Sequence, residues 1–279
     1  MSLLIITSTY NREQLLLRAI NSVIDAFDQN DKYLHVVIND SMEPLSSSVL
    51  TKSSNKLMFY QNDTNQGKNF SVHRAIMEFG GDFNYALSLD DDDMLLENIS
   101  LHDYVSANYA IIAHPKLITF LPVTGTTASV PQLSETLQSA IDLVVDQKGI
   151  EISFALKIDT YKRFAEKIRP LISRSGPELA IYDVVSRGAG GLIFLHYPVM
   201  ACEYQADGMT AGFRRRVQQY PGDFLAYYVY MSRKKGVLPR RRIYYFCGIG
   251  YCLFWQSLNL LTSVFLTKKN RGKLTKLYT

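Results

Sequence analysis

The sequence has few of the residues that build disulfide frameworks or zinc sites. Its 279 residues include three cysteines, Cys202, Cys247 and Cys252, which are too few and too unevenly spaced for either kind of site. The five histidines show no HxxxH or HExxH spacing. We therefore expect a reduced, cytoplasmic protein whose chemistry rests on other residue types.

The N-terminus lacks the long apolar run of a secretory signal. Only residues 3–6 are continuously apolar, and the polar segment TSTYNR follows at once, so the run is too short for a signal peptide. Hydrophobic residues make up 47% of the chain and charged residues 20%, which is typical of a globular protein. The length allows one large domain, or one domain with an appendage.

Acidic residues are scarce near the C-terminus. Residues 205–279 contain 14 Lys or Arg and two acids, so that this part has a net charge of +12, whereas residues 1–204 have a net charge of −8. The sequence therefore predicts an acidic body, residues 1–212, and a basic C-terminal region, residues 213–279. No RNA- or DNA-binding motif accompanies the basic residues, and we expect no nucleic-acid partner.

The body alternates short apolar runs with amphipathic segments. These patterns predict strands at 3–7, 35–40, 56–62 and 83–89, a helix from about 12 to 28 that is capped by Asn11, and a second helix that ends at Gly80 and Gly81. Further strands are expected at 117–123 and 150–156, a helix near 161–168, and a helix followed by a strand within 175–204. Strand–helix–strand repetition predicts parallel strands joined by crossover helices, and hence an α/β fold.

Three polar clusters follow predicted strands. They are TSTYNR after the first strand, NDS after the second and LDDDD after the fourth. Ligands of such sheets bind at the carboxyl ends of the strands. We therefore expect the three clusters to share one edge of the sheet and to form one site.

The four aspartates Asp90–Asp93 have two interpretations. Carboxylates favour a helix N-terminus, and the following MLLENISL could be that helix. One or two acids would suffice there, however, and further ones add repulsion. A D-x-D at a strand end suits Mg2+ or Mn2+, which take oxygen ligands and leave positions open for phosphate.

The ordered motifs resemble those of the family 2 glycosyltransferases of the GT-A fold. IITSTYNREQLLLRAINSVI, VVINDS, NQGKNFSVHRAI and ALSLDDDDMLL correspond, in order, to that family's P-T-Y-N-R segment, D-D-x-S strand end, N-x-G turn and L-D-x-D-D. The resemblance is strong over residues 3–96 and weak over 175–204. It implies a Rossmann-like, mostly parallel central sheet flanked by helices, with nucleotide-sugar binding in 1–98 and the acceptor side in 99–212.

The resemblance also implies roles for individual residues. Tyr10 would stack on the nucleotide base, and Asp40 would accept a hydrogen bond from it. The full nucleotide-sugar-binding set would be Ser8, Thr9, Tyr10, Arg12, Asp40, Gly67, Lys68, Asp90 and Asp91. Asp92 would bind Mn2+ or Mg2+ directly with help from Asp90, whereas Asp91 and Asp93 would support them. The metal would bridge the diphosphate and neutralise its charge as the nucleotide leaves.

The sequence departs from the family pattern at three motifs. Ser8 stands where the family has proline, and Asn39 replaces the first aspartate of D-D-x-S. Residues 71–73, Ser-Val-His, stand where the family often has Ala-Arg-Asn. Lys68 or Arg74 could replace the missing arginine, although both could equally be solvated helix charges.

The expected catalytic base is a carboxylate near the start of the helix predicted within residues 175–204. An inverting transfer needs such a group to take the proton of the acceptor hydroxyl. Aligning Pro198 with the family's conserved motif proline places Glu178 at the base position, with Asp183 as the alternative. Either could instead be an ordinary helix acid, and Asp183 would then be exposed. His73 and His196 are expected to be structural.

The basic region contains a long uncharged segment. Ile243–Leu266 holds 24 residues without a charge, which is long enough to cross a bilayer. Basic residues flank it on both sides, against the positive-inside tendency of a single span. We expect a helix that lies in the cytoplasmic face of the membrane and contacts anionic lipid, rather than a span or a buried helix that closes the domain.

These patterns together predict a metal-dependent inverting glycosyltransferase, peripheral on the inner face of the cell membrane. It would move one sugar from a nucleotide sugar to a lipid-linked or glycan acceptor, in O-antigen- or capsule-like polysaccharide synthesis. One alternative is a nucleotidyltransferase, although TSTYNRE lacks the glycine-rich phosphate loop of that class. The other is a non-catalytic, membrane-bound protein that binds nucleotide sugars.

Overall fold

The computed structural model describes residues 2–27, 32–96, 117–124, 153–174, 178–188, 192–202, 217–233 and 239–274. The chain forms two compact units. The first comprises residues 1–174 and 178–205, and the second comprises residues 175–177 and 206–279. The sequence prediction placed the boundary a little later, after residue 212.

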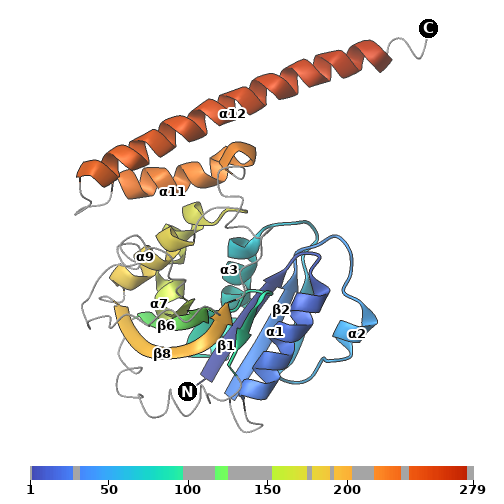
Figure 1. The fold of residues 1–279 in the computed structure, drawn as a ribbon, viewed down its shortest axis with the longest axis vertical. Helices are drawn as coiled ribbons and strands as arrows, with labels where there is room; N and C mark the ends of the chain where they lie inside the picture. The colour runs from blue at the N-terminus through green and yellow to red at the C-terminus, as the bar shows by residue number, and fades with distance from the viewer. Residues whose placement is uncertain are drawn as a thin grey trace. The chain divides into compact units, whose positions relative to one another are not determined.

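One mixed sheet organises the first unit (Figure 1). Within the described residues its order is β3-β2-β1-β4-β7-β6-β8-β5. The strands are β1 (Ser2–Thr9), β2 (Lys32–Asn39), β3 (Leu57–Gln61), β4 (Tyr85–Ser88), β5 (Asp93–Leu95), β6 (Leu117–Thr124), β7 (Ser153–Lys157) and β8 (Leu192–Cys202). Strand β1 is parallel to β2 and β4, β2 to β3, and β6 to β8, whereas β7 and β5 are antiparallel to their neighbours. The predicted α/β architecture with a mostly parallel sheet is confirmed.

The register of the parallel strands aligns their carboxyl ends. Thr9 of β1 is paired with Asn39 of β2, which is paired with Gln61 of β3. On the other side, Ile6 of β1 is paired with Ser88 of β4. The segments that follow β1, β2 and β4 therefore leave the sheet at the same edge, as the three polar clusters predicted.

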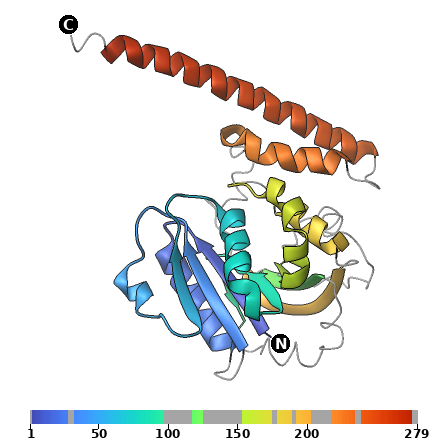
Figure 2. The ribbon, with the colours of Figure 1, turned by 180° about the vertical axis from the view of Figure 1, so that it is seen from behind.

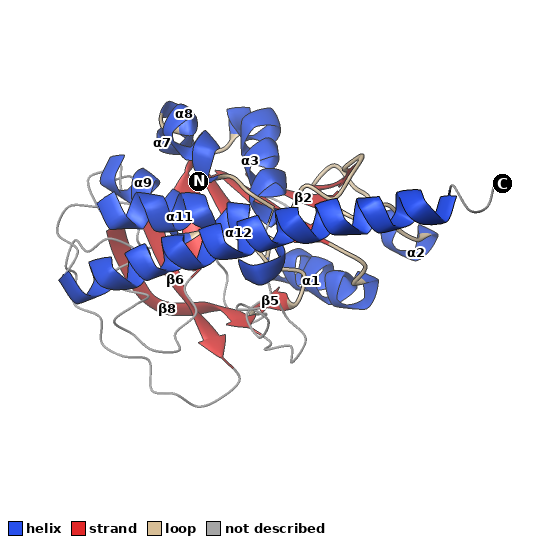
Figure 3. Cartoon of the chain, turned by 90° about the horizontal axis from the view of Figure 1, so that it is seen from above, coloured by secondary structure: helices blue, strands red, loops and turns tan. Residues whose placement is uncertain are grey.

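Helices cover both faces of this sheet. They are α1 (Glu13–Ala26), α2 (Ser47–Leu50), α3 (Lys68–Phe79), η1 (Gly80–Asp82), α7 (Ile158–Arg163), α8 (Ala165–Ile168), η2 (Arg169–Leu171) and α9 (Leu179–Gly188). Figure 3 shows α1 and α3 on opposite sides of the sheet. Figure 2, from behind, shows α3 (teal) and α7 (yellow-green), which contact each other.

The side chains of β1 point alternately to the two faces of the sheet, and both sets are buried. Leu3 and Ile5 pack with Ala19 and Val23 of α1, and the intervening residues point to the opposite face, where α3 contacts β1. Because both faces are covered, residues 2–7 are all buried. Each fully buried Leu or Ile side chain contributes about 1.5–3 kcal/mol of transfer free energy.

One local prediction is wrong, and one of the two interpretations of the four aspartates is excluded. The N-cap of α1 is Arg12 and makes no side-chain cap hydrogen bond, whereas Asn11 has a left-handed backbone with φ 57°. The four aspartates lead into strand β5 and not into a helix, so they do not form an acidic helix start.

The second unit contains a helical hairpin of α11 (Pro221–Arg233) and α12 (Pro239–Leu274). Tyr245 and Cys252 lie on the buried stripe of α12. Gly248 lies on the same stripe, where a Cβ would overlap the Tyr228 ring of α11. Among the side chains of α12 that the structure describes, the exposed large apolar ones are Ile243, Tyr244, Phe246, Tyr251, Leu253, Phe254, Leu260 and Leu261. In the described part of the chain, no helix is both long and apolar enough to cross a membrane.

Candidate active site

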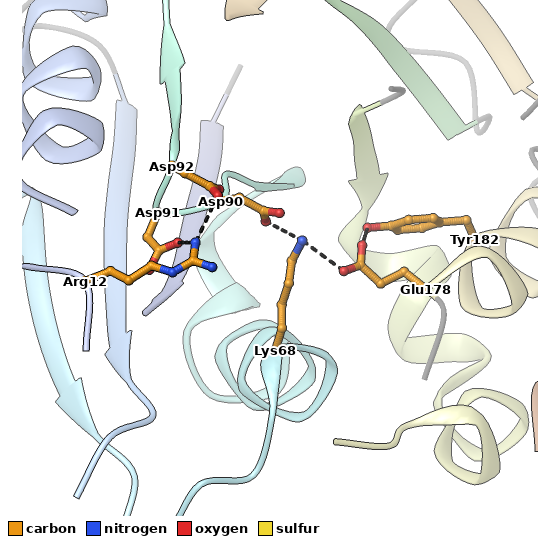
Figure 4. Close-up of polar contacts among 7 residues, drawn as sticks. All are labelled: Arg12, Lys68, Asp90, Asp91, Asp92, Glu178 and Tyr182. Atoms are coloured by element: carbon orange, nitrogen blue, oxygen red, sulfur yellow. Dashed lines mark hydrogen bonds and ion pairs between the residues drawn. The ribbon is translucent and has the colours of Figure 1, made fainter. Parts of the chain in front are cut away.

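The four aspartates form a tight turn between β4 and β5. The Asp93 backbone N–H donates to the Asp90 carbonyl at 3.1 Å, which closes a four-residue turn. Because β4 lies beside β1, this turn lies next to the segment that follows β1. Figure 4 shows the side chains of Asp91 and Asp92 pointing to Arg12, whereas the side chain of Asp90 points to Lys68.

Asp91 is the most buried of these carboxylates. Its Oδ2 accepts from the Thr9 hydroxyl at 2.8 Å, and its Oδ1 lies 3.1 Å from Arg12 Nη1. The same Nη1 lies 2.9 Å from Asp92 Oδ2. Burial raises the pKa of Asp91 to about 6, although the Thr9 hydrogen bond and the Arg12 charge lower it. Thr9, Arg12 and Asp91, three of the predicted site residues, are thus in direct contact.

Lys68, the first residue of α3, connects the aspartate turn to α9. Its Nζ contacts Asp90 Oδ1 and lies 2.9 Å from Glu178 Oε1. Burial lowers the pKa of Lys68, but the charges of Asp90 and Glu178 outweigh this effect and hold the pKa well above its usual value. Lys68 is therefore a cation shared between two carboxylates.

Tyr182 is a site residue that sequence reasoning missed. Its hydroxyl donates to Glu178 Oε2 at 2.7 Å (Figure 4). Burial raises the pKa of Tyr182 well above its usual value, and the Glu178 charge adds to this shift. The i,i+4 spacing of Glu178 and Tyr182 is the one signal in the sequence that could have linked them.

Asp40 is already engaged by the turn that precedes α3. Its Oδ1 accepts from the Gln66 backbone N–H and from Asn62 Nδ2, both at 2.8 Å, and its Oδ2 accepts from the Gly67 backbone N–H at 2.7 Å. Asp40 is 3% exposed. The carboxylate therefore fixes the backbone that presents Lys68, and its predicted contact with a nucleotide base stays a prediction.

Gly67 fits a position that no other residue fills without strain. Its φ is 89°, and a Cβ would overlap the backbone of Arg174. Left-handed backbone of this kind strongly favours glycine. Close packing against Arg174 thus brings the N-terminus of α3 near the segment that leads to Glu178.

Asn39 and Ser41 order the loop after β2. Asn39 Nδ2 donates to the Glu43 carbonyl at 2.7 Å and to Gln61 Oε1 at 2.8 Å, and its Oδ1 accepts from the Ser41 N–H at 3.1 Å. The Ser41 hydroxyl donates to Asn11 Oδ1 at 2.6 Å. An amide at position 39 can donate and accept within this network, which an aspartate could not do.

Arg74, one of the two candidates for the missing family arginine, does not contact the aspartate turn. Its guanidinium lies 4.0 Å from the Tyr60 ring centroid, and its Nε lies 2.8 Å from Glu78 Oε1. Nη1 donates to Asn62 Oδ1 at 3.1 Å. Of the two candidates, Lys68 is the one that reaches the acidic turn.

The two candidate bases differ in access. Glu178 immediately precedes α9, and its side chain is 26% exposed. It borders a small pocket with Asn69, Val72, Leu156, Tyr161, Ile181 and Tyr182. Asp183 lies within α9 with 0% exposure, so the expectation that it would be an exposed helix residue is wrong. The accessible carboxylate at this end of α9 is Glu178.

The other residues named in the sequence analysis differ in exposure and in their contacts. Tyr10 is 50% exposed, as a side chain that stacks on a ligand requires, and Ser8 is half-buried. His73 Nδ1 lies 3.1 Å from the Tyr161 hydroxyl, and burial lowers the pKa of His73, with the Arg169 charge adding to that effect. The side chain of His196 lies outside the described residues.

The donor set of the turn is compatible with a divalent metal that arrives with phosphate. Among the described residues, no three His, Cys, Asp or Glu side chains are grouped as a metal site. Asp90 and Asp92 offer hard carboxylate oxygens with side chains 37% and 18% exposed. Mg2+ usually needs only one or two protein carboxylates when phosphate oxygens complete its shell.

Comparison with known families gives one match, over the N-terminal part of the chain. Residues 4–107 match the family model described as glycosyl transferase family 2. This match covers part of the chain and supports a glycosyltransferase. Comparison with curated protein sequences gives no significant match. The matched segment contains the aspartate turn, Arg12, Asp40 and Lys68, and Glu178 lies beyond it.

Solved structures resemble this chain in fold. S. aureus TarS 1–349 aligns with a TM-score of 0.58 at 15% identity, over 91% of this chain and 71% of that one. Its complex with UDP-GlcNAc gives a TM-score of 0.59 at 14% identity, over 91% and 72%. Its complex with UDP gives 0.59 at 15% identity, over 91% and 71%. At this identity the likeness shows a shared fold.

Proposed function

We propose that this glycosyltransferase moves one sugar from a nucleotide-sugar donor to a lipid-linked or glycan acceptor, with inversion at the anomeric carbon. The observation that carries the proposal is the chain of contacts Asp90–Lys68–Glu178. It joins the aspartate turn, suited to a diphosphate and its metal, to an accessible carboxylate suited to take a proton. A single displacement needs both groups at one site.

The donor would be held by the segments that follow β1 and β4. Tyr10 offers an exposed ring for the base, and Arg12 orients Asp91 and Asp92 through its Nη1. Asp90 and Asp92 would hold Mn2+ or Mg2+, which would neutralise charge on the departing diphosphate. The complexes of TarS with UDP and UDP-GlcNAc support a uridine nucleotide as the first donor to test.

Glu178 would act on the acceptor. Its carboxylate accepts the proton of the acceptor hydroxyl as that oxygen bonds to the anomeric carbon, and the bond from the anomeric carbon to the diphosphate oxygen breaks with its electrons. Tyr182 holds Glu178 Oε2 and so limits the orientations of the carboxylate. The apolar members of the adjoining pocket, Val72, Leu156 and Ile181, would help to exclude water from this side.

The exposed face of α12 supports a membrane-bound acceptor. Phe246 and Phe254 are each 60% exposed and Leu260 is 66% exposed, while basic residues lie at both ends of the uncharged segment. Aromatic and aliphatic side chains combined with Lys and Arg suit a helix that lies in an anionic membrane surface. We propose that this face holds the enzyme at the inner surface of the cell membrane, for cell-surface polysaccharide synthesis.

Thermal unfolding with a panel of nucleotide sugars and Mn2+ tests the donor proposal. Binding to the folded state alone raises the midpoint of unfolding. We expect at least one nucleotide sugar to raise it in wild type, and Asp92→Ala to lose the Mn2+-dependent part of that shift. If no nucleotide sugar stabilises the protein, the proposal is wrong.

A further inference from the structure

Lys68 contacts both halves of the site at once. Its Nζ contacts Asp90 Oδ1 on the proposed donor side and lies 2.9 Å from Glu178 Oε1 on the proposed acceptor side (Figure 4). The Lys68 side chain is 19% exposed, so solvent screens these ion pairs less than it screens pairs on the open surface. A single ammonium is thus shared between the donor site and the proton acceptor.

Both oxygens of Glu178 have a donor in this arrangement. Oε1 is paired with Lys68, and Oε2 accepts from the Tyr182 hydroxyl at 2.7 Å. An acceptor hydroxyl that donates to Glu178 must therefore compete with one of these two contacts. Of these two partners of Glu178, Lys68 is the cation. Because Lys68 lies beside Asp90, the negative charge of a diphosphate bound at the aspartate turn would attract it.

We propose that Lys68 couples donor binding to the release of Glu178. The diphosphate of the bound nucleotide sugar attracts the Lys68 ammonium, because lysine binds phosphate as a flexible point charge. Lys68 then leaves Glu178 Oε1, while Tyr182 keeps the carboxylate in place. This inference rests on the proposed function, and it makes the proton acceptor available only after the donor has bound.

A thermodynamic cycle on nucleotide binding tests the coupling without any turnover. Isothermal titration of UDP with Mg2+ gives the Kd for wild type, Glu178→Gln, Lys68→Met and the double variant. If donor binding must break the Lys68–Glu178 pair, Glu178→Gln removes that cost. UDP should then bind about three- to tenfold more tightly, as expected for a partly exposed ion pair. In the Lys68→Met background, Glu178→Gln should leave the Kd unchanged.

The matched control removes an acid that does not contact Lys68. Glu166 is exposed on α8. The Glu166→Gln variant changes the net charge by the same amount as Glu178→Gln, and its Kd for UDP should equal the wild-type value. Thermal unfolding checks that each variant is folded, and Lys68→Gln replaces Lys68→Met if the latter is not.

Each outcome of the cycle has one meaning. Tighter binding in Glu178→Gln that persists without Lys68 overturns the coupling, because it shows simple repulsion between Glu178 and the ligand. An unchanged Kd in Glu178→Gln also overturns it and leaves the proposed function intact. If wild type binds none of UDP, GDP, ADP or dTDP with Mg2+, the proposed function fails and the coupling fails with it.

Discussion

Asp40→Asn should destabilise the first unit by loosening the turn before α3. The Asp40 carboxylate accepts three hydrogen bonds, from Asn62 Nδ2 and from the backbone N–H groups of Gln66 and Gly67. Asparagine keeps the size but offers one acceptor oxygen, and its amide nitrogen must face one of these donors. At least one buried N–H then loses its acceptor, and the bonds that remain lose their charge assistance.

The structure sets the size of this effect. Hydrogen bonds to a charged group contribute about 1.5–3 kcal/mol each, and an unsatisfied buried donor costs about 1–3 kcal/mol. We therefore expect Asp40→Asn to lower the free energy of unfolding by about 3 kcal/mol. For a unit of roughly 200 residues, this corresponds to a fall in Tm of about 6–12 °C.

Urea denaturation at pH 7 measures the change directly. The matched control is Asp63→Asn, which removes an exposed acid from the same loop and should change the free energy of unfolding by less than about 0.5 kcal/mol. Equal midpoints for the two variants, together with weaker nucleotide binding in Asp40→Asn alone, would contradict a structural role of the Asp40 carboxylate in this turn. The carboxylate would then act on the base and not on the turn.

Three further changes test other parts of the account. Burial lowers the pKa of His35 to about 3. Because the unfolded state binds more protons than the folded state below pH 6.5, the free energy of unfolding should fall by about 2 kcal/mol between pH 7 and pH 5. In urea titrations, His35→Gln should show less of this fall than wild type. Gly67→Ala should cost more than about 2 kcal/mol in the same assay because its Cβ meets backbone, whereas Gly81→Ala, with open space, should be nearly neutral. Replacing Phe246 and Phe254 together by Ser should weaken flotation with anionic vesicles at least about tenfold, and unchanged flotation would contradict a membrane role for this face.

The sheet was predictable because its signals are local. Buried parallel strands are short apolar runs, and amphipathic helices with glycine stops separate them. The strands predicted at 3–7 and 35–40 therefore overlap β1 (Ser2–Thr9) and β2 (Lys32–Asn39). The common position of the three polar clusters was predictable because the carboxyl ends of parallel strands lie at the same edge of a sheet. The cap of α1 was not predictable, because Asn11 instead accepts a hydrogen bond from Ser41, which lies in a different loop.

Several predicted site residues lie together in the fold, but the contacts between them were not predictable. The family resemblance ranked the aspartates by their expected metal contacts, but it did not predict that Asp91 is buried beside Thr9 or that Asp90 faces Lys68. The contact between Lys68 and Glu178 joins residues from α3 and the start of α9. Such a contact depends on how the helices pack on the sheet, and no local pattern encodes it.

Release of nucleoside diphosphate from a nucleotide sugar in the presence of Mn2+ measures whether the aspartate turn supports cleavage of a nucleotide sugar. The account predicts slow hydrolysis of at least one donor by wild type and loss of at least about a hundredfold in Asp92→Ala. Asp82→Ala, which removes an exposed acid away from the turn, should keep the wild-type rate. Equal rates in wild type and Asp92→Ala would contradict the account, as would release of pyrophosphate from a nucleoside triphosphate in place of sugar transfer.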